Sequence, residues 1–185
     1  MKTAYHRKKQ PTAVRAEIVT ATIELASKLG LSGISIQAVA DLAKITKGGL
    51  LHHFPNKQSL VHAVFNLLLE NLDLEIDKLM SEDPDPIGSF TRAYIKSSFQ
   101  GLAKNKNSIW RVFATSLLTD SDLRERWYLW LDGRLEKHRS TDSGVNLEIV
   151  RLATDGAWYL LIDKKTRNSR IASSKIQENL ILMTR

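Results

Sequence analysis

The run KGGLLHHFPNK at residues 47–57 gathers the side chains best suited to binding a polyanion. Lys and His donate hydrogen bonds to phosphate oxygens and base edges, and glycines let the backbone approach a partner closely. A helix of about two turns that begins with such residues suits the major groove of DNA. The residues that we expect to contact DNA are Ser35, Gln37, Thr46, Lys47, Gly48, Gly49, Leu51, His52, His53 and Lys57.

Two short helices joined by a tight turn must position these residues. Ser35 is a natural N-cap for the first helix and Thr46 for the second. Lys44 and Ile45 make the turn between them, and Pro55 stops the second helix. The pattern predicts a helix-turn-helix. Many helical domains contain such a helix pair and never touch DNA, so the pattern by itself leaves that alternative open.

Residues 43–60 resemble the recognition region of the TetR family of bacterial transcription regulators. The usual family pattern there is Ala-Gly-Val-Ser-x-Gly-(Thr/Ala/Ser)-Leu-Tyr-x-(Tyr/His)-Phe-x-x-Lys-x-x-Leu. Three positions of this chain depart from it: Lys44 replaces the turn glycine, Gly49 a hydroxyl residue or alanine, and Leu51 the tyrosine. Lys44 must therefore adopt whatever backbone the glycine adopts, and Leu51 cannot donate a hydroxyl to a phosphate. The resemblance is specific over residues 13–65.

The length and composition favour an all-α protein. The 185 residues contain no cysteine, and the 4 prolines fall at expected joints between helices. Strand-like alternation is scarce, and no apolar run of about 18 residues predicts a membrane span. The N-terminal segment lacks the hydrophobic region of a signal peptide, so we expect a cytoplasmic protein without a membrane partner. We expect about nine helices, with a helix-turn-helix domain at residues 1–56 and a C-terminal effector-binding and dimerisation domain at residues 57–185.

Most of the positive charge lies in the predicted DNA-binding region. The net charge is +7, and residues 1–57 hold nine Lys or Arg side chains but three acidic ones. This excess lies where a polyanion would bind. The run Arg7-Lys8-Lys9 either reaches a phosphate or the minor groove, as flexible arms do, or is a solvated tail.

Aromatic residues of the C-terminal part suggest a ligand site. They could stack on a flat apolar or cationic molecule, or they could simply fill the core. The family resemblance implies a small effector there. The residues that we expect to line its site are Tyr94, Phe99, Trp110, Phe113, Trp127, Trp130 and Trp158. Asp155 and Asp163, on roughly one face of the same predicted helix, could attract a cation, although solvated carboxylates are commoner.

Small residues on the predicted helix at residues 145–164 would let another helix come close. This helix packs either within the subunit or against a second subunit, and the resemblance implies a homodimer through the last two long helices. The residues that we expect at the dimer interface are Ala153, Gly156, Ala157, Leu160, Ile176 and Leu180. Ala153-x-x-Gly156 followed by Asp163 is similar to the multidrug-binding branch of the family.

Enzyme chemistry has no support in the sequence. Phosphate-binding glycine loops, nucleophile elbows and zinc-protease motifs are missing, so we expect neither an enzyme nor a cofactor. We expect no metal at His52 and His53, because neighbouring helical side chains point about 100° apart.

Two functions remain. The resemblance implies a repressor that binds a palindromic operator as a homodimer and is released by an effector. The alternative is an effector-independent DNA-binding protein whose C-terminal aromatics are only core.

Overall fold

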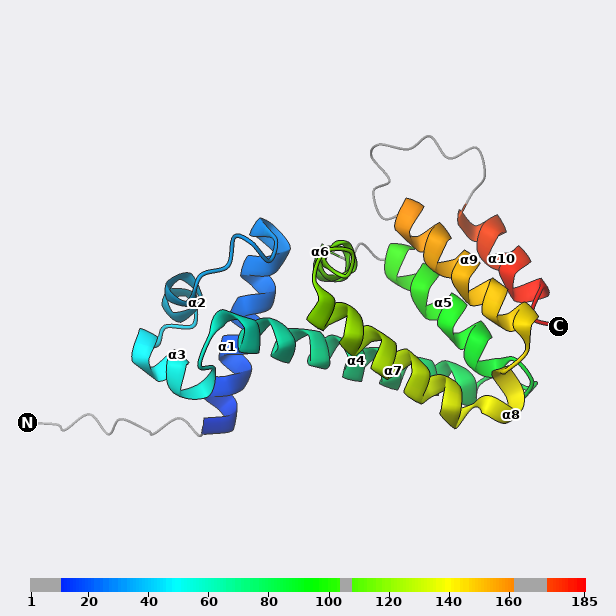
Figure 1. Cartoon of the computed structure of the whole chain (residues 1–185), viewed down its shortest axis with the longest axis horizontal. Coiled ribbons are helices and arrows are strands. Elements are labelled where there is room, and N and C mark those ends of the chain that lie inside the picture. The colour runs from blue at the N-terminus through cyan, green and yellow to red at the C-terminus, as the bar shows by residue number, and fades with distance from the viewer. Residues whose placement is uncertain (1–10, 104–107, 162–172) are drawn as a thin grey trace, which may run out of the picture. The chain divides into compact units, whose positions relative to one another are not determined.

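The computed structural model describes residues 11–103, 108–161 and 173–185. These residues form ten α-helices and no strand, which confirms the all-α prediction (Figure 1). The helices are α1 (Pro11–Leu29), α2 (Ile36–Leu42), α3 (Lys47–His53), α4 (Lys57–Ser81), α5 (Ser89–Ala103), α6 (Ser108–Ser116), α7 (Ser121–Lys137), α8 (Arg139–Asp142), α9 (Val145–Leu161) and α10 (Ser173–Leu182). About nine were expected; the additional helix is α8, which has only 4 residues and a polar sequence, RSTD.

The first compact unit covers Met1–Asn66 and includes the first turns of α4. Its core is apolar: Ile18 of α1, Val39 of α2, Leu50 of α3 and Leu60 of α4 are all fully buried. Each helix is too short or too weakly amphipathic to be stable alone, so this shared core holds the four together. Gly30, with a left-handed φ of 73°, ends α1 as expected of a glycine just after a helix.

The second compact unit, Leu67–Arg185, is built around α5. One face of α5 packs with α9 and α10, where Ile95, Phe99, Val150 and Leu180 form a buried cluster. Figure 1 shows these three helices side by side. A second cluster contains Phe90 and Tyr94 of α5, together with residues of α4 and α7. A helix that is covered on both sides is buried around most of its circumference, and so α5 is the centre of this unit.

The start of α5 differs from the prediction. Asp85-Pro86 is a sequence pattern typical of a helix start and predicts a helix from Pro86, but α5 begins at Ser89. Gly88 has a φ of 72°, a left-handed conformation that cannot continue an α-helix, and its N–H donates to the Thr141 carbonyl at 2.9 Å. A Cβ at this position would lie 3.2 Å from the Thr184 carbonyl. The backbone therefore needs glycine here both for its φ and for the close approach of the C-terminus.

Arg92, a buried cation on α5, fastens the loop between α4 and α5. Its Nε and Nη2 donate to the two carboxylate oxygens of Asp83 at 2.8 and 3.0 Å, and Nη1 donates to the Ile87 carbonyl at 2.7 Å. Both side chains of this ion pair are almost fully buried. The hydrogen bond from Arg92 keeps the pKa of Asp83 below its ordinary value. A buried arginine needs such bidentate pairing because it cannot lose its charge.

Replacing Asp83 with Ala should therefore lower the free energy of unfolding by about 3 kcal/mol, because Arg92 stays buried without its counter-charge. Urea denaturation followed by tryptophan fluorescence reports on this unit, which contains all 4 tryptophans. The matched control is Glu82→Ala, since Glu82 forms a solvent-exposed pair with Lys78 at 4.0 Å. Similar small losses from both variants would contradict the assigned role of Asp83.

Candidate functional site

Two side-chain caps fix the helix-turn-helix as the sequence predicted. Ser35 Oγ accepts a hydrogen bond from the Ala38 N–H at 3.1 Å and caps α2. Thr46 Oγ1 accepts from the Gly49 N–H at 3.0 Å and caps α3. Each cap satisfies a backbone donor that a helix start leaves unpaired, so both short helices begin at a defined residue.

Lys44 makes the turn between α2 and α3 in a glycine-like conformation. Its φ is 56°, and among the residues that the structure describes no other non-glycine residue has a positive φ. The Lys44 N–H donates to the Asp41 carbonyl at 3.1 Å, and the next N–H, of Ile45, to the Ala40 carbonyl at 3.0 Å. The turn thus keeps the geometry that the family pattern assigns to glycine, and the Cβ of lysine makes it strained.

Replacing Lys44 with Gly should therefore raise the free energy of unfolding of the first unit by about 1 kcal/mol. Glycine removes the strain in the folded turn, and this gain outweighs the extra conformational entropy that glycine gives the unfolded chain. Thermal unfolding followed by circular dichroism measures this change. Lys44→Ala is the control, because alanine loses the charge and keeps the Cβ. If glycine and alanine give the same melting temperature, the turn is not strained.

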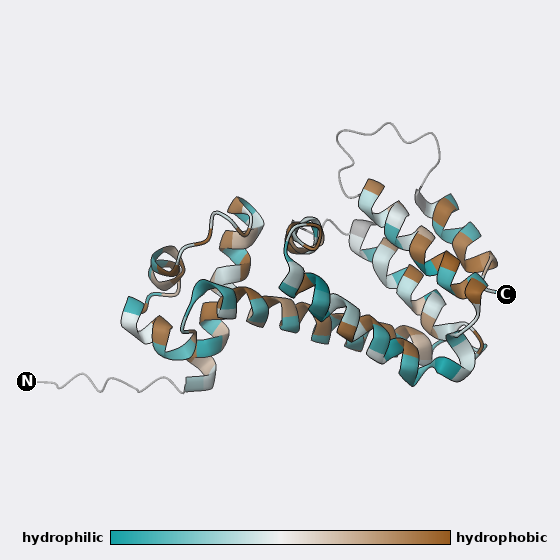
Figure 2. Cartoon of the chain, viewed as in Figure 1, coloured by the Kyte–Doolittle hydropathy of each residue, from teal (hydrophilic) through white to brown (hydrophobic). Residues whose placement is uncertain are grey.

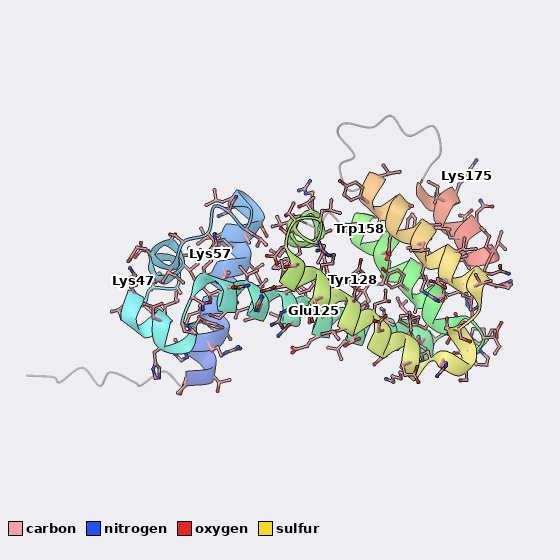
Figure 3. All side chains as sticks on the ribbon, in the orientation of Figure 1. Lys47, Lys57, Glu125, Tyr128, Trp158 and Lys175 are labelled. Carbon is pink, nitrogen blue, oxygen red and sulfur yellow. The ribbon has the colours of Figure 1, made fainter. Side chains whose placement is uncertain are left out.

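The helix α3 buries one face and exposes the other. Leu50 and, just after the helix, Phe54 are buried and anchor it to the core of the unit. Lys47, Gly48 and His52 are exposed. These three exposed positions are among those that we predicted to contact DNA, and they are accessible to a partner. Lys47 lies at the start of α3 (Figure 3).

The two glycines of α3 differ in their surroundings. A Cβ on Gly48 would meet nothing within 4 Å, whereas a Cβ on Gly49 would lie 3.1 Å from Thr46 Oγ1. The absence of a Cβ at Gly49 therefore leaves room for the capping hydroxyl of Thr46. The open space beside Gly48 is where a partner could approach the backbone.

Four of the predicted DNA-contacting side chains already have hydrogen-bond partners inside the unit. Ser35 and Thr46 cap α2 and α3, as described above, and Gln37 Nε2 donates to the Asp41 carboxylate at 2.7 Å. Lys57, at the start of α4 (Figure 3), donates from Nζ to the Ser32 carbonyl at 3.2 Å, which tethers the loop before α2. These bonds are exposed, so they hold the side chains in place at the surface.

A basic residue that the motif did not identify lies beside the end of α3. The Arg15 guanidinium of α1 lies 4.8 Å from the centre of the Phe54 ring. Arg15 is exposed, and this cation–π contact fixes its position near the recognition helix. In the sequence, the excess of basic residues in the N-terminal region was the signal that pointed to Arg15. Its contact with Phe54 depends on tertiary structure and could not be predicted.

The seven aromatic residues predicted to bind a ligand do not form one group. The rings of Trp127 and Trp130 are in contact, with centres 4.9 Å apart and planes tilted by 34°, and both pack on the cluster that contains Tyr94. Trp110 contacts Trp127 edge to face at 6.5 Å. Phe99 and Trp158 belong to the other cluster, between α5, α9 and α10, and Phe113 is fully buried. A surface hollow of about 390 Å³ on α7, lined by Asp122, Glu125, Arg126 and Leu129, contains none of the seven.

Asp155 of α9 connects these two aromatic clusters. Its carboxylate accepts a hydrogen bond from the hydroxyl of the buried Tyr94 on α5. Burial raises the pKa of Asp155 to about 6, and it raises the pKa of Tyr94 well above its ordinary value, so the tyrosine remains the donor. Asp163, the other carboxylate that we named for a cation, lies outside the described residues.

The raised pKa makes stability depend on pH. Below about pH 4 Asp155 is protonated in both the folded and the unfolded protein; between about pH 4 and 6 only the unfolded protein loses the proton, so folding weakens as pH rises. Asp155→Asn removes this effect and keeps an acceptor for Tyr94. At pH 8 we expect Asp155→Asn to be about 2 kcal/mol more stable than the wild type, with a much smaller difference at pH 4. Urea titrations at both pH values test this; a difference independent of pH would contradict it.

The predicted dimer residues separate into an exposed and an inward set. Ala153, Gly156 and Leu160 of α9 are exposed, whereas Leu180 of α10 is buried within the subunit and Ile176 packs beside it. The exposed face also contains Ile149 and Leu152, which the prediction did not include. Leu152 and Ile149 precede Gly156 by four and seven residues, a spacing that puts all three on one face of a helix and that the sequence already shows. Figure 2 shows hydrophobic residues along α9 and α10.

No group of three or more His, Cys, Asp or Glu side chains in the described part of the chain could hold a metal ion. Within the same residues, no helix is both long and apolar enough to span a membrane.

Two family models match the chain. Residues 18–64 match the model of "Bacterial regulatory proteins, tetR family", and residues 88–172 match "Tetracyclin repressor-like, C-terminal domain". The first match contains α2, the turn and α3, and the second contains α5 and α9. Together they cover most of both compact units.

Known regulators and solved structures are similar to this chain, in agreement with the two family models. The HTH-type transcriptional regulator RutR of Escherichia coli K12 is 27% identical over 66% of this chain, and the alignment spans 57% of RutR. The multidrug binding protein EbrR, solved with malachite green, shares the fold with a TM-score of 0.72 at 16% identity, over 91% of this chain and 96% of EbrR. AibR, solved with isovaleryl coenzyme A and operator DNA, has a TM-score of 0.62 at 16% identity, over 92% of this chain and 97% of AibR.

The capped helix-turn-helix, the all-helical second unit and the two family matches lead to one conclusion. The chain belongs to the TetR family of transcription regulators.

Proposed function

We propose that this regulator is a repressor that binds a palindromic operator as a homodimer and leaves it when a small molecule binds the second unit. The main support for the proposal is that α3 is anchored on one face and exposed on the other. Leu50 and Phe54 anchor the helix, and its exposed face holds Lys47, Gly48 and His52. A short, rigidly capped helix with such a face fits the major groove.

The basic residues around α3 would contact phosphates. Lys47 is exposed at the start of the helix, and Lys57 is held at the surface by the Ser32 carbonyl. Arg15 would add a third positive charge beside the end of α3. Such contacts position a protein on DNA without reading its sequence, whereas His52 and the open backbone at Gly48 are suited to base edges.

The exposed apolar face of α9 supports the homodimer. Ile149, Leu152 and Leu160 are between 52% and 65% exposed, and Gly156 has open space around its Cα. Burying such a face against its copy would remove apolar area from water, and the small residues Ala153 and Gly156 would allow the helices to approach closely. One reading helix covers only a few base pairs, so two copies related by a two-fold axis suit a palindrome.

The aromatic side chains of the second unit support an effector site there. EbrR and AibR were solved with malachite green and with isovaleryl coenzyme A, respectively, and in this chain Trp127, Trp130 and Trp158 offer ring surfaces to a planar apolar or cationic molecule. The long helix α4 belongs to both compact units, and so a shift at its second-unit end would reach the turns that support α3. An effector must prefer the released conformation, and about 3 kcal/mol of preference lowers operator affinity more than 100-fold.

Fluorescence anisotropy with DNA flanking the protein's own gene tests the DNA-binding role. We expect two protomers per site, with selectivity over scrambled DNA. Lys57→Ala should weaken binding to both DNAs and reduce the slope of log affinity against log salt by about one, because one phosphate contact is lost.

The matched control is Lys28→Ala, since Lys28 is exposed on α1 and pairs with Glu24 at 2.6 Å. It should leave the slope unchanged. An unchanged slope in Lys57→Ala would mean that Lys57 only tethers the loop at Ser32. Equal binding to flanking and scrambled DNA across the salt series would favour the effector-independent alternative.

A further inference from the structure

Lys44 holds a backbone conformation that is unfavourable for lysine. Its φ of 56° lies in the left-handed region, which suits glycine and, to a lesser degree, asparagine and aspartate. Glycine lacks the Cβ that clashes there, and the short polar side chains of the other two can hydrogen-bond to nearby backbone. Lysine has neither advantage, so the folded turn by itself does not explain why a lysine stands at this position.

The ammonium group of Lys44 has no partner among the described residues. The side chain is exposed, and the hydrogen bonds and ion pairs between described residues do not include it. Asp41, the acidic residue nearest in the sequence, accepts instead from Gln37 Nε2 at 2.7 Å. Asp41 is also the single acidic residue between positions 25 and 60, where there are four lysines. This charge is therefore available to an anion from outside the chain.

The turn places the charge of Lys44 next to the exposed face of α3. Lys44 lies two residues before Thr46, which caps α3, and three residues before the exposed Lys47 at the start of the helix (Figure 3). Its N–H donates to the Asp41 carbonyl at 3.1 Å, which ties the turn to the end of α2. The backbone of Lys44 is thus held in place, while its flexible four-carbon side chain can extend to a partner.

From these observations we infer that Lys44 contacts a phosphate of the DNA backbone beside the groove that α3 enters, and that this contact offsets the strain of the turn. A phosphate is the matching partner because lysine is a flexible point charge, which suits an anion better than the fixed donor and acceptor pattern of a base edge. The family pattern has glycine at this position, so the contact is particular to this chain. The inference rests on the proposed DNA-binding role of α3.

This assignment gives two parts of one side chain opposite effects. The Cβ of Lys44 strains the folded turn, whereas the charge acts only when DNA is bound. Removing the whole side chain should therefore make the protein more stable and its binding to DNA weaker. A purely structural role predicts otherwise, because relief of strain in the turn before α3 would leave DNA binding unchanged or improved. Strain that persists at the expense of stability is typical of functional sites.

Four full-length proteins separate the two effects: the wild type, Lys44→Arg, Lys44→Ala and Lys44→Gly. Thermal unfolding followed by circular dichroism should depend on the Cβ, so that Lys44→Gly melts at the highest temperature and the other three melt together. DNA binding measured by fluorescence anisotropy should depend on the charge. Lys44→Arg should bind like the wild type, and Lys44→Ala and Lys44→Gly should both bind more weakly.

The salt dependence identifies the lost contact as a phosphate. Losing one phosphate contact reduces the slope of log affinity against log salt by about one, so the deficit of Lys44→Gly should shrink about fourfold between about 50 and about 200 mM salt. The deficit should be equal on DNA flanking the gene and on scrambled DNA, because a phosphate contact does not read sequence. Lys28→Ala removes an exposed lysine of the same unit and should leave the slope unchanged.

Each outcome decides the inference. It is overturned if Lys44→Gly binds DNA with the slope of the wild type, if Lys44→Arg loses as much affinity as Lys44→Ala, or if Lys44→Gly is no more stable than Lys44→Ala. The scrambled DNA keeps the two proposals apart. Equal binding of the wild type to both DNAs, with a reduced slope in Lys44→Gly, would support the phosphate contact and refute the selective repressor. A selective wild type with an unchanged slope in Lys44→Gly would do the reverse.

Discussion

The buried polar contacts of α5 are the constraint on which the second unit depends. This helix is covered on both sides, and yet it carries Thr91 and Arg92 into the interior. Asp83 neutralises Arg92, while the Asp142 carboxylate accepts from both the N–H and the hydroxyl of Thr91, at 2.8 and 2.7 Å. Buried polar groups are tolerated only when they are paired, so these contacts fix where the chain on either side of α5 must run.

A second arginine shows the same principle on α7. Arg134 donates to Asp77 at 2.6 Å and lies over the Phe90 ring, which stacks on His138 at 5.4 Å. The hydrogen bond from Arg134 lowers the pKa of Asp77, and burial lowers that of His138. This contact joins α4, α5 and α7 by directional bonds. Asp155 differs from these pairs because its described hydrogen bond comes from the neutral hydroxyl of Tyr94.

Local contacts define the key features of the first unit, and long-range contacts define those of the second. In the first unit, two caps and a strained turn fix where α3 begins, and so local contacts define its exposed face. In the second unit, aromatic residues and a lone carboxylate meet only through the packing of helices. The helix α4 has residues in both units and connects them without a break in the helix.

The sequence by itself determined the features that depend on neighbouring residues. The caps at Ser35 and Thr46 and the glycine-like turn at Lys44 were readable because their hydrogen-bond partners lie within five residues. Gly88 was missed as the reason for the late start of α5, because its role comes from contacts with Thr141 and Thr184.

Tertiary structure alone decided how distant residues combine. It placed five of the seven predicted ligand aromatics in two separate clusters, buried Leu180 within the subunit, and paired Tyr94 with Asp155 across 61 residues of chain. Helical periodicity shows which residues share a face, but it does not say which helix covers that face. That choice depends on the packing and charge pairing of the whole unit, and so only the folded chain shows which of the predicted residues lie together.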